Sequence, residues 1–419
     1  MRSLLAAGWA AFLICFVSAA ARPSESPLPE PGPISVPLSF QEIAKRALPS
    51  VEALGVESRL AESFQLLGAG RGHLREGPTV GIATGPRRGP SATTGDLAVE
   101  VELPLALASE PRNRLAAAVA SAAAALREGA AREARLRLRR AYLDAWLAER
   151  ILSLRAAELS TVETWLAAAR ARLAAGADPP FEASLVEGEI LGARLALDQA
   201  REERTLAWGA LRALASLPEE PSPLADPDSE VPPGVSDASV LPERCGAGPL
   251  VRALDTGFAL ETAMARFRLS RELEPWSLRG GASREGDERF ARLGLAYRFR
   301  LSGEPETLRR ETEARLEAAR RNLDLDRAAL DARCRAALER SAGLAGAPPS
   351  PDFARALSAV GLRLQEGRER PSDALPIRRQ LFEAQAAVLR REHAAQVVAA
   401  ELSALTDAPS APSPSGAQP

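Results

Sequence analysis

Charged side chains alternate with apolar or small ones in two short segments, which are the chain's most suggestive candidates for chemistry. Glu100 and Glu102 lie in the first segment, and Arg292, Arg298 and Arg300 lie in the second. A strand with this alternation would carry its charges on one face and its apolar side chains on the other. Such a charged face could line a water-filled passage, or its opposite charges could pair across strands and hold a sheet together. Both interpretations stay open from the sequence.

Constellations for catalysis or metal binding are not found. The chain has two histidines, two methionines and three cysteines, which are too few for a dedicated metal pathway. Gly-x-Ser-x-Gly, His-Glu-x-x-His, Cys-x-x-Cys and the phosphate-binding Gly-x-x-x-x-Gly-Lys motif are all missing. We therefore expect no enzyme, no catalytic residue, no metal site and no cofactor.

Composition and the first residues indicate a helical, exported protein. The 419 residues are 46% hydrophobic and 26% charged, and the formal net charge of −2 argues against a nucleic-acid partner. Arg2, an apolar run from Leu4 to Val17 and small residues at 18–21 predict a signal peptide over residues 1–21. Lipidation at Cys15 is the less favoured alternative, because a bulky isoleucine precedes it. No later run reaches the roughly 20 apolar residues of a membrane helix, so any crossing is expected by strands.

The longest predicted element is a helix from Arg112 to Gly176. Leucine or alanine recurs every seventh residue from Leu138 to Leu173, and Arg155 interrupts a second apolar seam. Two such seams indicate a helix that packs against other helices along its length. The helices before and after it have together about its own length, so they are expected to lie end to end beside it.

The same plan occurs twice along the chain. After a Pro-rich lead-in at 22–38, residues 39–217 comprise a helix, a hairpin at 79–103, the helix at 112–176 and a helix at 181–217. After a linker at 218–248, residues 249–407 comprise a helix, a hairpin at 276–301, a long helix at 305–367 and a helix at 372–406. Prolines at 348, 349 and 351 interrupt the second long helix, and the tail at 408–419 is expected to be disordered. The remaining cysteines, Cys245 and Cys334, are expected to be free thiols rather than a disulfide.

Both long helices end in the same motif, in which arginine and leucine precede a glycine. The glycine is the residue type that ends helices, and an acidic residue six positions later falls in the first turn of the next helix. The two copies, 191 residues apart, are Arg172-Leu173-x-x-Gly176 and Arg363-Leu364-x-x-Gly367.

With its duplication, two hairpins and two such motifs, the chain resembles the TolC-like outer-membrane efflux family over about residues 38–407. The segments Pro104-Leu105-x-Leu107 and Gly280–Gly286 resemble most the CzcC-type branch, which serves heavy-metal resistance-nodulation-division pumps. The chain departs from the family pattern in two ways. Neither copy of the motif has Ser or Thr three residues after its glycine, and the first hairpin lacks aromatic residues. An aromatic girdle would therefore depend on Trp276, Phe290, Tyr297 and Phe299.

The resemblance implies a mainly α fold with a small β part: a long α-helical coiled-coil barrel, and four strands per subunit in a trimeric, 12-stranded transmembrane barrel. It implies a passive exit duct of a tripartite efflux or secretion system, in the outer membrane with its helices in the periplasm, served by an adaptor protein and an inner-membrane pump. Glu100, Glu102, Arg292, Arg298 and Arg300 would face the lumen. The adaptor would dock on Arg172, Leu173, Gly176, Arg363, Leu364 and Gly367. The alternative is a soluble periplasmic coiled-coil protein with vestigial hairpins and no pore.

Overall fold

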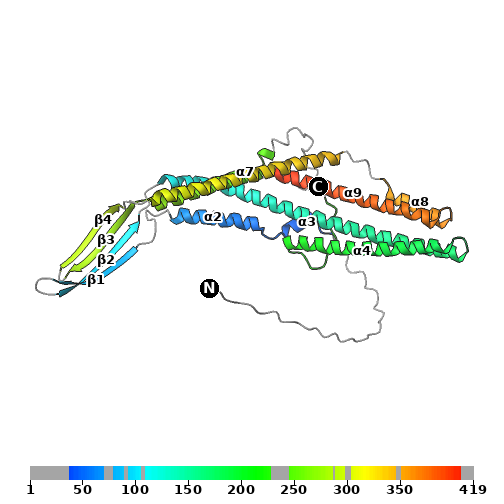
Figure 1. Ribbon diagram of the computed structural model, residues 1–419, viewed down its shortest axis with the longest axis horizontal. Coiled ribbons are helices and arrows are strands. Elements are labelled where there is room, and N and C mark those ends of the chain that lie inside the picture. The colour runs from blue at the N-terminus through cyan, green and yellow to red at the C-terminus, as the bar shows by residue number, and fades with distance from the viewer. Residues whose placement is uncertain are drawn as a thin grey trace, which may run out of the picture. The chain divides into compact units, whose positions relative to one another are not determined.

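A computed structural model describes residues 37–69, 79–88, 93–104, 109–227, 245–285, 288–297, 303–345 and 351–406. This part of the chain is mainly helical and contains one four-stranded antiparallel sheet (Figure 1), which confirms the predicted fold class. The predicted signal peptide, most of the Pro-rich lead-in, much of the linker, the tail, Arg298, Phe299 and Arg300 lie outside the described residues.

The elements follow one another in an order that occurs twice: helix, two strands, then long helices. They are α1 (Phe40–Lys45), α2 (Val51–Ala69), β1 (Thr79–Arg88), β2 (Thr93–Pro104), α3 (Ser109–Ala174), α4 (Pro180–Leu214), α6 (Pro249–Leu273), β3 (Trp276–Glu285), β4 (Glu288–Tyr297), α7 (Glu304–Ala345), α8 (Phe353–Gln365) and α9 (Pro371–Leu405).

Helix α3 is the element around which the other helices pack. Helices α2 and α4 lie one after the other along it (Figure 1), as the comparison of lengths predicts. Near its start, Leu115 and Val119 pack with Leu60 of α2 and with Phe267 of α6. Near its end, a cluster around Trp165 joins it to α4, α8 and α9. Helix α3 is therefore buried against different partners at its two ends.

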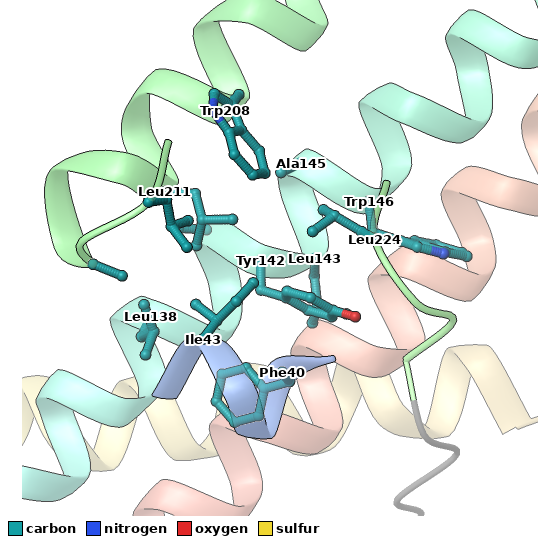
Figure 2. Packing of buried hydrophobic residues seen from close by; sticks show 13 residues of the cluster. Phe40, Ile43, Leu138, Tyr142, Leu143, Ala145, Trp146, Trp208, Leu211 and Leu224 are labelled. Atoms are coloured by element: carbon teal, nitrogen blue, oxygen red, sulfur yellow. The ribbon is translucent and has the colours of Figure 1, made fainter. Parts of the chain in front are cut away.

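The middle of α3 is held by an aromatic cluster in which the short helix α1 covers it (Figure 2). Ser39 and Glu42 form the capping box that begins α1, and Phe40 then meets the ring of Tyr142 edge-on at 5.7 Å. The Tyr142 hydroxyl donates to the carbonyl of Ala225 at 2.6 Å, and Leu224 packs in the same cluster. The segment that leaves the first half is thereby fixed against α3.

The second long helix is interrupted where the prolines predict, and it consists of two helices. Helix α7 ends at Ala345 and α8 begins at Phe353, and the sequence between these two bounds contains the three prolines. Arg391 of α9 donates to the Leu344 carbonyl at 3.1 Å, and Asp352 accepts the Arg355 amide at 3.0 Å. The ends on both sides of the break are thus capped.

The prediction of two free thiols is wrong, because Cys245 and Cys334 form a disulfide. Their Cα atoms are 6.4 Å apart and both residues are buried beside Leu405. The bond joins the end of the linker to α7 across a separation of 89 residues. Closing a loop of that size restricts the unfolded chain, which corresponds to about 4–5 kcal/mol in the entropic account.

One buried carboxylate joins α9 to α3 and α7. Glu401 is 2% exposed and accepts from Arg333 at 2.7 Å and from Arg340 at 2.8 Å, while Arg140 lies at 2.9 Å. Burial alone would raise the pKa of Glu401, but the Arg333 hydrogen bond and the charges of Arg140, Arg333 and Arg340 outweigh it and lower the pKa below 4.5.

Glu401→Gln is expected to reduce the free energy of unfolding by about 1–3 kcal/mol at neutral pH, because hydrogen bonds to a charged group are lost. The folded-state pKa is lowered, so this contribution is full above pH 4.5 and is lost as the pH falls through the folded-state value. Urea titrations at several pH values should show the two proteins converging in acid. Glu392→Gln, an exposed site on the same helix, is the control. A pH-independent difference would contradict this.

Candidate functional site

The four strands form one sheet in chain order, and their register divides the side chains between two faces. Val101, for example, is opposite Val80 on β1 and Gly280 on β3. One face is apolar and carries Val80, Ile82, Leu97, Val99, Val101, Leu103, Leu278, Leu293 and Leu295. Leu293 is 79% exposed and Ile82 is 69% exposed, so this face is not covered within the described part of the chain. An exposed apolar sheet face of this kind is suited to lipid or to another protein surface.

The opposite face is polar and brings together three of the predicted lumen residues. Glu100, Glu102 and Arg292 all lie on it, and Gly281 stands between Glu100 and Arg292 in one row of the register. Glu102 accepts from the Ser277 hydroxyl at 2.8 Å and from Arg279 at 3.1 Å. Cross-strand ion pairing is therefore real at Glu102, whereas Glu100 and Arg292 are exposed.

Arg279 is a polar-face residue that the sequence did not single out. It lies on β3, which continues through Gly280 and Gly281 to Glu285. A Cβ on Gly281 would lie 3.3 Å from the Val99 carbonyl oxygen, so glycine serves here for close strand approach rather than for turning. The alternation of residue types from Trp276 onward could have indicated this strand and the place of Arg279 on its polar face.

The aromatic residues divide between the two faces. Trp276 and Tyr297 are opposite each other on the apolar face at the end near the helices, with ring centres 4.9 Å apart and planes at 78°. Phe290 lies on the polar face opposite Ser283, so its expected place in a girdle on the apolar face is wrong. The alternation of the pleat places it one residue out of phase with Leu293 and Leu295.

The two helix ends with the Arg-Leu-x-x-Gly motif have the same backbone structure. Gly176 and Gly367 both have φ of 72°, a conformation that favours glycine. The amide of Ala177 donates to Arg172 and that of Gly176 to Leu173, and the corresponding pairs are repeated at the second end. Both are Schellman caps. Ending the helix is therefore one reason for the motif, whether or not it also has a functional role.

We call these two helix ends, around Gly176 and Gly367, the first and second tips. Side chains of the first tip bind the second tip within the same subunit. Arg172 donates to the carbonyls of Leu364 at 3.1 Å and Glu369 at 3.2 Å, and it pairs with Asp178 at 2.7 Å. Glu182, 1% exposed, accepts from the amide and hydroxyl of Ser372 at the start of α9.

The repeat-related residues of the second tip behave differently. Arg363 and Asp373 are exposed, Leu364 is fully buried, and Leu173 is half-buried. The six predicted docking residues thus lie together, with Arg363 and the two glycines at the surface and Arg172 directed to the neighbouring tip.

Arg172→Ala is expected to loosen the contact between the tips, because the carbonyls of Leu364 and Glu369 lose a charged donor. Amide hydrogen exchange over residues 363–372 should become about tenfold faster, as the loss of one charged hydrogen bond predicts. Arg170→Ala, which removes a surface ion pair with Glu187, should leave exchange there unchanged. Equal exchange in both variants would show that Arg172 does not join the tips.

Comparison with known proteins adds the family to this geometry. Residues 67–216, which include the first hairpin, α3 and α4, match the family model described as outer membrane efflux protein. A comparison with curated proteins gives no match.

Solved outer-membrane channels share the fold over most of this chain. The Campylobacter jejuni CmeC channel is 14% identical with a TM-score of 0.64, over 87% of this chain and 85% of that one. The Vibrio cholerae outer membrane protein VceC is 16% identical with a TM-score of 0.59, over 87% and 95% of the two chains. The open Neisseria gonorrhoeae MtrE channel is 18% identical with a TM-score of 0.53, over 87% of each.

The efflux-protein match and the channel fold agree with each other and confirm the resemblance inferred from the sequence. The matched family model is that of an outer membrane efflux protein and the similar structures are channels rather than enzymes, which together support an outer-membrane efflux duct. Nothing in the fold favours a soluble coiled-coil protein. Placement in the CzcC-type branch stays a prediction. Among the described helices, none has the length and hydropathy needed to span a bilayer.

Proposed function

We propose that three copies of this chain assemble into a passive exit duct of a tripartite efflux or secretion system. The observation that carries this is the sheet, which has one exposed apolar face and one charged face on strands of ten to twelve residues. Strands of about 9–11 residues are long enough to cross a bilayer. The apolar face would meet lipid and the charged face water.

The edges of the sheet support assembly of several copies. In the described part of the chain β1 and β4 each pair on one side only, so each carries an open edge. Four strands cannot enclose an aqueous pore, whereas β4 of one copy pairing with β1 of the next closes the sheet and removes its edges. The two structural repeats, residues 39–217 and 249–407, would each supply one hairpin and one set of helices to the assembly.

The helix tips are the proposed contact with a periplasmic adaptor. They lie at the ends of α3 and α8 that are far along the chain from the strands, so a duct with its strands in the outer membrane would present them to the periplasm. Exposed Arg363, Gly176 and Gly367 would form the docking surface, with Leu173 partly accessible. Arg172 and Leu364, which are less exposed, would hold the two tips in position beneath that surface. An inner-membrane pump would supply the energy.

The charged strand residues are the proposed lining of the lumen. Glu100, Glu102 and Arg292 share the polar face, and Arg279 joins them; Arg298 and Arg300 continue the alternation of β4 in the sequence. Their charges would tune which ions and solutes pass.

Ion conduction by the purified protein in a planar bilayer tests this proposal. We expect stepwise currents, and Glu100→Lys should shift the relative permeability from cations toward anions, because the lumen loses a negative charge and gains a positive one. Glu110→Lys, an exposed site at the start of α3, is the control for a charge change outside the sheet. Absence of current from the wild-type protein would contradict the duct, and an unchanged permeability ratio would contradict the lumen assignment.

A further inference from the structure

On the apolar face of the sheet, the residue types at the two ends of β3 and β4 differ from those in the middle. Successive opposed pairs on this face are Trp276 with Tyr297, Leu278 with Leu295, Gly280 with Leu293, Ala282 with Ala291, and Arg284 with Arg289. An aromatic pair thus stands next to the helices, aliphatic and small residues follow, and two arginines stand at the hairpin turn.

The distance between the two ends matches a membrane. Trp276 and Arg284 are separated by eight positions (284 − 276) on one strand, which at a rise of about 3.3 Å per residue spans roughly 26 Å. A strand tilted by about 40° would cover roughly 20 Å of that across the bilayer, close to the apolar band of about 25 Å in outer-membrane barrels. With the aromatic pair at one interface, the arginine pair reaches the headgroup level of the other.

The arginines themselves are suited to anions. They are exposed and directly opposite each other. On β2 the residue opposite Arg284 is Leu97, so the pair borders the apolar surface. Guanidinium groups bind phosphate through two parallel hydrogen bonds, and their alkyl stems can lie along apolar surface.

We propose that Arg284 and Arg289 bind the phosphate groups of lipids in the outer leaflet of the membrane. This inference rests on the proposed function, which places the apolar face in lipid and the hairpin turns on the side away from the periplasmic helices. A phosphate bound by the two guanidinium groups anchors the duct at a fixed depth.

The full-length protein tests this in vesicles of phosphatidylcholine, alone, with lipopolysaccharide, or with enzymatically dephosphorylated lipopolysaccharide. The test variant is the double substitution Arg284→Gln and Arg289→Gln. The matched control is Arg292→Gln, which lies on β4 like Arg289 but on the opposite face of the sheet. Lipopolysaccharide retained per chain after washing and the thermal unfolding midpoint are measured.

Wild type and control should retain phosphorylated lipopolysaccharide about tenfold more strongly than the double variant, as loss of charged hydrogen bonds predicts. Only the phosphorylated form should raise their unfolding midpoint. Equal retention by the double variant, or equal retention of the dephosphorylated lipid by wild type, overturns the proposal. Failure of the wild-type protein to enter any of the vesicles instead overturns the proposed function.

Discussion

Leu293→Arg is expected to prevent stable insertion of this protein into membranes. Leu293 is 79% exposed and lies midway along β4 on the apolar face, two residue pairs from both the arginine pair and the aromatic pair. An arginine at the middle of the lipid-facing surface of a barrel costs about 2–4 kcal/mol, and three copies in one assembly would multiply that cost. The fraction of protein that resists carbonate extraction from the outer membrane should fall to a small remainder.

Gly294→Arg is the matched control for this variant. It introduces the same side chain one position later, on the polar face, where a Cβ at position 294 meets no atom within 4 Å. Insertion should therefore stay near the wild-type level. If the two variants were lost from the membrane to the same extent, the assignment of lipid-facing and lumen-facing sides would be wrong.

Arg378→Ala is expected to have the largest effect on the stability of the helical part. Arg378 is 1% exposed, donates to Glu189 at 2.7 Å and to Glu158 at 3.3 Å, and so joins α9 to α4 and α3. Burial lowers the pKa of Arg378, with the charges of the two glutamates opposing that effect. Removing one partner of a buried ion pair leaves an uncompensated charge and costs about 3–5 kcal/mol.

The neighbouring residue supplies the control, because Arg379 also pairs with Glu189 but is exposed to solvent. Exposed pairs contribute at most about 1 kcal/mol, so Arg379→Ala should shift the unfolding free energy little. Urea titration of the detergent-solubilised proteins measures both values. Equal losses in the two variants would mean that burial of Arg378 does not set its importance.

Features that depend on local periodicity could be predicted from the sequence. The heptads of α3, the glycine caps at Gly176 and Gly367, and the apolar alternation around Leu293 all appear in the structure at the expected places. Each depends on residues that are close together in the sequence, so the local pattern is enough to predict it.

Features that depend on distant partners could not be predicted in the same way. The path of β3 through Gly280 and Gly281 depends on its pairing with β2 and β4, and two cysteines alone did not indicate their pairing. Arg155, which interrupts an apolar seam of α3, donates to Glu158 at 2.7 Å and to Glu383 of α9 at 2.8 Å. Likewise, the contact of Arg172 with the second tip requires the packing of both halves.

The central claim is that this chain forms an oligomeric duct with its sheet in the outer membrane. The most direct measurement is the mass of the full-length protein after carbonate washing of outer membranes and extraction in mild detergent. The account predicts that the protein stays in the washed membrane and has, once the detergent contribution is subtracted, three times the mass of one mature chain. Release by carbonate as a single chain would contradict it.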